Sequence, residues 1–317
     1  MLREAMGRRC AVTSTADNNR ELHMLHRFLI SALTGSLACF AAAVHAQDPT
    51  QTPADELLAA KLGSERPIAA RQSYWLEELT WMEIRDLVAS GHTTVIIPTG
   101  GIEENGPFLA TGKHNVILEG SCPAIASQLR NALCAPIVKF VPEGRIDPPT
   151  GAMRFPGTIS LSASTYEALL TDIASSLRQS GFTDIVMIGD SGGNQRGMKN
   201  VAATLNARFA DTPSRFHFIE AFYNPGWEAT ENYTRDVLGV DETQKDGHHD
   251  DIWVTAMMMV TDPTQVRFDE RVAAGLASIN GVPLTPLRDV VSLGERMIAF
   301  RARMTADAIR EAIESAR

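Results

Sequence analysis

The sequence predicts an α/β fold, a three-layer sandwich in which helices flank a mostly parallel sheet. Two features predict it. Short apolar runs typical of buried strands alternate along the chain with longer amphipathic stretches typical of helices. The apolar runs are nearly continuous, as expected for parallel strands that helices cover on both faces. The 317 residues, 44% of them hydrophobic and 21% charged, suit one large domain of this kind or two small ones.

The first expected element is a helix over residues 80–89, because Thr80 followed by Glu83 forms a capping box. The other elements alternate after it. We expect strands at residues 94–98, 137–141, 184–188 and 216–221, and helices at residues 116–133, 165–180, 195–209, 249–260 and 291–316. Ligands of parallel sheets bind beyond the carboxyl ends of the strands, so a site is expected in the segments that follow the strands.

The N-terminus predicts export. His26 and Arg27 precede an apolar run over residues 28–44, which ends in a small-residue cleavage pattern at Ala46. A membrane anchor is the alternative, but a spanning helix needs about 20 strongly apolar residues, and this run is shorter and less apolar. We therefore expect a periplasmic or secreted protein, cleaved after Ala46, with no membrane span in the mature chain. The expected organisation is a start-site artefact (residues 1–23), a signal peptide (24–46), an N-terminal arm (47–72) and an α/β domain (73–317).

The net charge argues against nucleic acid as a partner. The chain has 29 basic and 38 acidic side chains, a net charge of −9, and no block of Lys and Arg. Phosphate backbones are bound by clustered positive charge. A small organic molecule is the expected ligand.

Two cysteines, Cys122 and Cys134, remain once the signal peptide is removed. Both fall in one stretch that predicts a helix. Their separation along such a helix is about 18 Å, which is far beyond the reach of a disulfide. We expect two buried thiols.

Side chains that bind metals follow the first expected strand. A glycine-rich turn there leads to Glu103, Asn105 and His114. A carboxylate and an imidazole on one loop suit a divalent ion such as zinc or manganese. The alternative is a solvated loop whose acids face water.

The loop after the second expected strand, residues 142–158, is rich in Pro and Gly, which is typical of a rigid surface loop. Either it walls a pocket, with Arg145 or Arg154 reaching a substrate, or it is a structural connection.

The segment after the third expected strand supports two chemistries. Residues 189–194 lead straight into a helix, and the glycines leave backbone amides at its start accessible, which can form an oxyanion site. Asp190 in this turn is a candidate metal ligand. The same residues match the G-x-S-x-G nucleophile elbow of serine hydrolases. In that alternative Ser191 attacks, and the amides around Gly192 and Gly193 hold the oxyanion. The base is then a later histidine: His217, His248 or His249.

Residues 246–251 form the densest set of candidate functional groups, with His248, His249, Asp250 and Asp251 just before a predicted helix. The alternative is that the acids favour the helix N-terminus while the histidines lie on the surface. Two histidines and two acids exceed what a helix start requires, so we interpret the cluster as functional.

Taken together, these segments resemble the creatininase (creatinine amidohydrolase) family over roughly residues 75–262. The motifs follow the family's order: a Leu-Thr-Trp helix start at 79–83, the segment 98–114, an intact F-P-G-T-x-S-L motif at 155–161, a turn at 189–194 similar to N-G-H-G-G-N, and the segment 248–255. The resemblance implies a creatininase-like three-layer fold, a divalent metal, and a homo-oligomer, commonly a hexamer.

The sequence departs from the family's metal ligands. Glu103 keeps the first metal-binding glutamate, but Asn105 stands in place of a metal-binding histidine and His114 in place of a bridging aspartate. Ser191 replaces the histidine of the glycine-rich turn, beside Asp190, which offers a carboxylate. We therefore expect a rearranged site in which Glu103, His114 and Asp190 hold the zinc or manganese ion.

The resulting hypothesis is metal-dependent hydrolysis of a non-peptide C–N bond in a small linear or cyclic amide. The ion lowers the pKa of a water, and the cluster at 246–251 provides a histidine, oriented by an aspartate, that protonates the leaving nitrogen. Asn105 and the amides of Ser191, Gly192 and Gly193 hold the oxyanion. Two alternatives remain: a serine hydrolase that uses Ser191, and a non-catalytic exported protein that binds a small molecule.

Overall fold

The computed structural model describes residues 52–244 and 247–317. The predicted signal peptide and the segment before it lie outside the described residues. The chain divides into two compact units, residues 1–57 and 58–317, and the second contains the whole sheet. Within the described ranges, no helix has the length and the apolar character that crossing a membrane requires.

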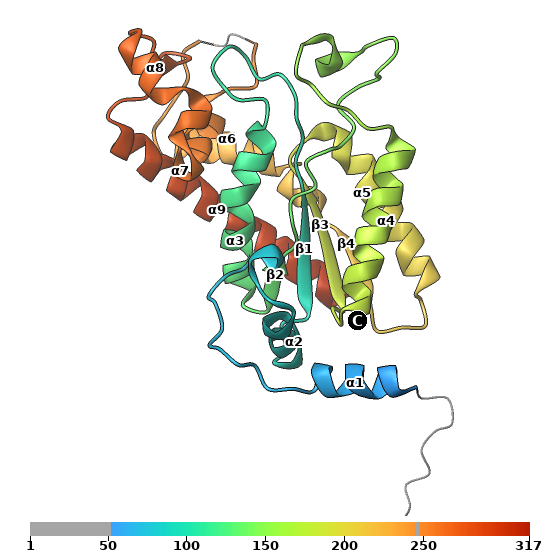
Figure 1. Cartoon of the computed structure of the whole chain (residues 1–317). Helices are drawn as coiled ribbons and strands as arrows, with labels where there is room; N and C mark the ends of the chain where they lie inside the picture. Colours follow the sequence, from blue (N-terminus) through green and yellow to red (C-terminus); the bar gives the residue numbers. More distant parts are fainter. Residues whose placement is uncertain (1–51, 245–246) are drawn as a thin grey trace, which may run out of the picture. The chain divides into compact units, whose positions relative to one another are not determined.

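A four-stranded parallel sheet forms the centre of the second unit (Figure 1). Its strands are β1 (Thr94–Thr99), β2 (Ala132–Cys134), β3 (Asp184–Gly189) and β4 (Arg215–Phe218), in the order β2-β1-β3-β4. Thr94 lies opposite both Ala132 and Asp184, and all neighbouring strands run parallel. Every residue of β1 and β3 is buried, as the continuous apolar runs predict.

Helices cover both faces of this sheet. On one face α2 (Trp81–Ala89), α4 (Ala163–Gln179) and α5 (Gln195–Arg208) share an apolar core with the strands. On the other face α3 (Lys113–Leu129) and α9 (Leu287–Ser315) share a second core. β1 alternates between the two, because Val95 and Ile97 belong to the first core and Ile96 to the second. The predicted three-layer α/β sandwich is confirmed.

A third apolar core surrounds α7 (Ile252–Thr261), which packs against α3 and α9. The other helices and strands are α1 (Pro53–Leu62), α6 (Gly226–Asp236), α8 (Phe268–Ala273) and the hairpin of β5 (Ser278–Ile279) and β6 (Val282–Pro283). Short 3₁₀ helices lie at η1 (Leu76–Glu78), η2 (Gly151–Arg154), η3 (Gly192–Asn194), η4 (Glu220–Phe222) and η5 (Pro263–Val266).

The predicted capping box starts α2. The Thr80 hydroxyl accepts a hydrogen bond from the Glu83 amide at 3.4 Å, and the Glu83 carboxylate accepts one from the Thr80 amide at 2.7 Å. The amides of Thr80 and Glu83 are thereby satisfied at the helix start. This sequence prediction is confirmed.

The second strand was predicted in the wrong place. β2 covers residues 132–134 rather than 137–141. Pro136 lies two residues beyond its end and has no N–H to give to a strand ladder. Beyond this proline the chain pairs through isolated bridges at Val138 and Val141. The segment still runs along β1 and delivers its following loop to the same edge of the sheet.

The expectation of two buried thiols is wrong, because Cys122 and Cys134 form a disulfide with a Cα–Cα distance of 6.2 Å. The 18 Å separation assumed one continuous helix over residues 116–133. Instead α3 ends at Leu129, and Arg130, with a left-handed φ of 67°, turns the chain back towards the sheet. Cys134 on β2 then faces Cys122 on α3 within the same core.

Removing this disulfide is expected to lower the free energy of unfolding by about 3 kcal/mol, because it frees a short loop in the unfolded chain. The measurement is urea unfolding of a Cys122→Ala/Cys134→Ala double variant against the oxidised wild type. Alanine is chosen because both positions are buried. A thiol assay of the unreduced wild type in denaturant that finds both cysteines free would contradict the pairing.

Candidate functional site

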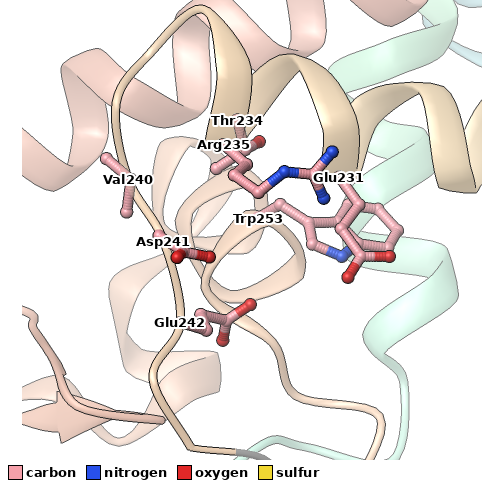
Figure 2. Close-up of a pocket in the computed structure, with 7 residues that line it drawn as sticks. All are labelled: Glu231, Thr234, Arg235, Val240, Asp241, Glu242 and Trp253. Atoms are coloured by element: carbon pink, nitrogen blue, oxygen red, sulfur yellow. The ribbon is translucent and has the colours of Figure 1, made fainter.

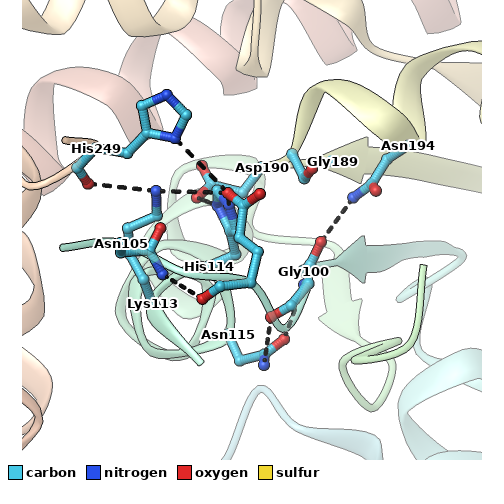
Figure 3. Close-up of polar contacts among 12 residues, drawn as sticks. Gly100, Asn105, Lys113, His114, Asn115, Gly189, Asp190, Asn194 and His249 are labelled. Atoms are coloured by element: carbon cyan, nitrogen blue, oxygen red, sulfur yellow. Dashed lines mark hydrogen bonds and ion pairs between the residues drawn. The ribbon is translucent and has the colours of Figure 1, made fainter. Parts of the chain in front are cut away.

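The candidate site lies beyond the carboxyl ends of β1 and β3 (Figure 3). After β1 the chain turns at Gly100, whose missing side chain makes room for the Asn115 amide. Asn115 donates to the Gly101 carbonyl at 3.0 Å, and Asn194 donates to the Gly100 carbonyl at 2.9 Å. One asparagine comes from α3 and the other stands at the start of α5, so two helix starts hold the loop that carries Glu103.

His114, on the first turn of α3, is buried between two carboxylates. Its Nε2 lies 2.7 Å from Glu103 Oε1 and its Nδ1 lies 2.7 Å from Asp190 Oδ2. Burial and the charge of Lys113 oppose protonation, but the hydrogen bonds to Asp190 and Glu103 outweigh them and raise the pKa of His114. The three residues that the sequence predicted as metal ligands are therefore brought together.

Asp190 is already engaged through both of its oxygens. Oδ2 meets His114, while Oδ1 lies 2.8 Å from Arg301 Nη2, and the side chains of Asp190 and Arg301 are fully buried. Burial would raise the pKa of Asp190, but the Arg301 charge and the His114 hydrogen bond hold it below its usual value. Asp190 thus fixes the orientation of the imidazole, the role that carboxylates commonly play behind a metal-binding histidine.

Glu143 joins the site from the loop after the second strand segment. Its Oε2 accepts a hydrogen bond from Ser191 Oγ at 3.0 Å, whereas its buried Oε1 has no hydrogen-bond partner among the described residues. One ligand atom each from Glu103, His114 and Glu143 lies within 4.8 Å of the others. Burial and the negative charge of Glu103 raise the pKa of Glu143 to about 7.

Sequence reasoning missed Glu143. The signal was present, because an acid directly after an expected strand occupies the same position as the acids that were selected after the other strands. In that loop, Arg145 and Arg154 were the residues predicted to reach a substrate. Arg145 lines a cavity of about 550 Å³ together with Pro142 and Gly193, so the loop does wall a pocket.

Lys113 was also missed. It is the first residue of α3, and its side chain is fully buried. Its Nζ donates to the His249 carbonyl at 3.3 Å and lies 3.8 Å from Glu103 Oε1. Burial lowers the pKa of the Lys113 ammonium, against the pull of the surrounding carboxylates.

The cluster at 246–251 is divided by the structure. The helix expected from residue 249 begins at Ile252, so the described part of the cluster is a loop. His249, 63% exposed, points its Nδ1 at Glu103 Oε1 from 3.9 Å, and His248 lies 3.4 Å from Glu104.

The two acids of the cluster have different surroundings. Asp250 is fully buried and acts electrostatically on Lys113. Asp251 lies 3.3 Å from the Asn280 amide.

Asn105 lies on the same loop as Glu103. It is buried, and its amide nitrogen donates to the Glu103 carbonyl at 2.8 Å. Its Oδ1 is buried without a hydrogen-bond partner in the described part of the chain. Asn105 therefore holds the Glu103 backbone in place.

The geometry does not favour the serine-hydrolase alternative. That chemistry needs an imidazole on the Ser191 hydroxyl, but this hydroxyl donates to Glu143. His217 bonds Asp184, the first residue of β3, at 3.0 Å, which places it at the opposite end of the strand from Ser191. Within residues 52–244 and 247–317, no histidine hydrogen-bonds to Ser191.

An aromatic wall borders the site, and sequence reasoning missed it. Trp227 lies 6.1 Å from the His114 ring and 5.3 Å from the Tyr223 ring, between ring centroids. A side chain at Gly192 would meet the Tyr223 hydroxyl at 2.9 Å, so that hydroxyl sits against the glycine-rich turn. Burial and the nearby carboxylates raise the pKa of Tyr223, which keeps its hydroxyl protonated and able to donate.

Trp253 packs edge-on against Trp227. It also lines a separate small pocket (Figure 2). This pocket is lined by Glu231, Thr234, Arg235, Val240, Asp241, Glu242 and Trp253. Its volume of about 30 Å³ holds water but no organic substrate.

The family description "Creatinine amidohydrolase" matches residues 77–294. The chain belongs to the creatininase family. A creatinine amidohydrolase from Pseudomonas putida is 26% identical over 117 residues, which cover 37% of this chain and 44% of that relative. The aligned part of the chain thus spans less than half the length of this relative.

Solved structures of the creatininase family share the fold. A structure titled "Creatininase Mn" has a TM-score of 0.57 at 20% identity, over 76% of this chain and 98% of that one. A mutant creatininase of Zn–Zn type has a TM-score of 0.55 at 20% identity over the same shares. A putative creatinine amidohydrolase from Bacteroides fragilis has a TM-score of 0.52 at 18% identity, over 77% and 98%.

Proposed function

We propose that this creatininase-family protein is a metal-dependent amidohydrolase that cleaves a non-peptide C–N bond of a small linear or cyclic amide. The observation that carries the proposal is the convergence of Glu103, His114 and Glu143, whose ligand atoms lie within 4.8 Å of one another. Two carboxylates and an imidazole suit zinc or manganese. Glu143 replaces Asp190 in the ligand set expected from sequence.

The residues fit a metal ion. Glu143 Oε1 is a buried acceptor without a hydrogen-bond partner among the described residues, and such an oxygen is costly unless a cation or donor meets it. His114 Nε2 faces the same space, while Nδ1 is held by Asp190. A carboxylate on the second nitrogen fixes the tautomer and the ring orientation that a metal ligand requires.

A divalent ion held there would supply a water of lowered pKa and would polarise the amide carbonyl. The chain's own residues would do the rest. His249 lies at the exposed mouth, 3.9 Å from Glu103, where it can deliver a proton to the leaving nitrogen. The Tyr223 hydroxyl beside Gly192 can donate to the developing oxyanion, together with the amides of the glycine-rich turn.

We also propose that the protein is exported and forms a homo-oligomer. Export is supported by the N-terminal sequence pattern and by the disulfide between Cys122 and Cys134, since structural disulfides persist in oxidising compartments. Assembly is proposed by analogy with the family. Sedimentation of the purified mature chain tests it, and a sharp monomer boundary at micromolar concentration would overturn it.

The test of function combines metal removal with a panel of small linear and cyclic amides. The purified chain is expected to contain zinc or manganese and to hydrolyse at least one member of the panel. A chelator is expected to remove at least about 90% of this rate, and adding back the ion to restore it, because the metal provides the nucleophile and polarises the carbonyl.

Three outcomes separate the alternatives. Hydrolysis by metal-free protein that is unchanged by chelator would sink the metal mechanism. A covalent serine-directed probe that labels Ser191 would support the serine hydrolase instead. Tight capture of an amide without turnover would indicate the binding protein.

A further inference from the structure

Two buried cations share the candidate site with its carboxylates. Lys113 places its ammonium 3.8 Å from Glu103 Oε1, and its side chain is fully buried. Arg301, from the middle of α9, is also fully buried, and its Nη2 lies 2.8 Å from Asp190 Oδ1. Arg301 is held further by the Phe222 carbonyl, which accepts from Nε at 3.1 Å and from Nη2 at 2.7 Å. Neither cation is free to move into solvent.

These cations occupy the oxygen atoms that a second metal ion would need. Both carboxylate oxygens of Asp190 already have a buried partner, Arg301 at Oδ1 and His114 at Oδ2. Metal ions in two-metal sites lie about 3.5–4 Å apart and are bridged by shared ligands. Around Glu103 that neighbouring position is held by the Lys113 ammonium.

The charges lead to the same conclusion. Glu103, Glu143 and Asp190 carry three negative charges when ionised, and Lys113 and Arg301 carry two positive charges. One divalent ion brings this buried group to +1, whereas two ions would bring it to +3. A buried excess of positive charge is strongly unfavourable. The two side chains supply as much positive charge as one divalent ion.

A further pair next to the site does not alter this count. Asp250 acts on Lys113, but Arg271 in turn experiences the negative charge of Asp250. The two opposite charges add nothing to the net charge of the site.

We propose that Lys113 and Arg301 stand in for a second metal ion, so that the chain binds a single divalent ion where a structural relative is of Zn–Zn type. This inference rests on the proposed metal-dependent function. It assigns Lys113 and Arg301 as positioning residues: they hold the carboxylates around one ion and exclude another.

The experiment counts metal ions and does not depend on activity. The full chain is stripped with chelator, titrated with Zn²⁺ at pH 8, dialysed and analysed for zinc per chain. The wild type is expected to bind one ion. Lys113→Met, which keeps the apolar stem and removes one of the two charges, is expected to bind its ion about tenfold tighter because a like charge is gone, as measured by competition against a fluorescent zinc chelator. Lys113→Arg and the exposed control Lys139→Met are expected to bind one.

The outcomes separate this inference from the proposed function. Two ions in the wild type would overturn the inference and leave the metal-dependent function standing. No ion in the wild type would overturn both. One ion in the wild type that folded Lys113→Met binds no more tightly would overturn the role of Lys113. Should Lys113→Met fail to fold, the number of ions bound by the wild type and by Lys113→Arg still tests the inference, which requires one ion in each.

Discussion

Glu143→Gln is expected to bind Zn²⁺ about 100-fold or more weakly than the wild type, because the amide cannot supply the charge that the ion requires. Glutamine keeps the size of the side chain and an oxygen that can still accept from Ser191, 3.0 Å away. The loss of affinity is therefore attributable to the oxygen that faces Glu103 and His114 and not to a collapse of the loop. Competition against a fluorescent zinc chelator measures the affinity.

The same carboxyl gives metal binding a pH dependence of defined sign. Burial and the charge of Glu103 raise the pKa of Glu143 to about 7, so below pH 7 the incoming ion must displace a proton. The apparent affinity is expected to fall about tenfold per pH unit for this proton, and the raised pKa of His114 steepens the fall. In Glu143→Gln the slope loses the contribution of one proton.

The matched control is Glu314→Gln, which changes an exposed glutamate near the C-terminus. It is expected to keep both the affinity and the pH slope of the wild type. If Glu143→Gln behaves like this control, Glu143 is not a ligand. The metal would then have to be held by another set of residues.

The part of the site that lies along the sheet edge follows from the sequence. Asp190 comes directly after β3, and Glu103 lies on the loop that follows β1. Both strands are recognisable as continuous apolar runs, and parallel strands bring their carboxyl ends to one edge. His114 joins them because α3 starts at the same edge. Their convergence could therefore be predicted without any measurement of distance.

The residues that were missed depend on pairings that sequence spacing does not contain. Glu143 follows a strand segment that Pro136 interrupts, so its alignment with β1 rests on isolated bridges rather than a continuous ladder. Arg301 is one polar residue within a 29-residue helix and meets Asp190 from 111 positions away. On an amphipathic helix with several arginines, each arginine is expected on the solvated face. Its burial is decided by tertiary packing.

Arg301→Met is expected to lower the free energy of unfolding by about 3–5 kcal/mol, because it leaves the buried Asp190 carboxylate without its guanidinium partner at Oδ1. Both side chains are fully buried and 2.8 Å apart, so water cannot replace the lost partner. Urea unfolding measures the change. Arg296→Met, at an exposed position of the same helix, is the control and is expected to stay within about 0.5 kcal/mol of the wild type.

A second substitution separates the buried charge from the lost packing of the arginine. Adding Asp190→Asn to Arg301→Met removes the uncompensated charge, so the double variant is expected to be more stable than Arg301→Met alone. It should still bind Zn²⁺ weakly, because a neutral amide orients His114 less firmly than the carboxylate does. If the double variant is no more stable than Arg301→Met, the stability that Arg301 contributes comes from its packing on Phe222 and not from its pairing with Asp190.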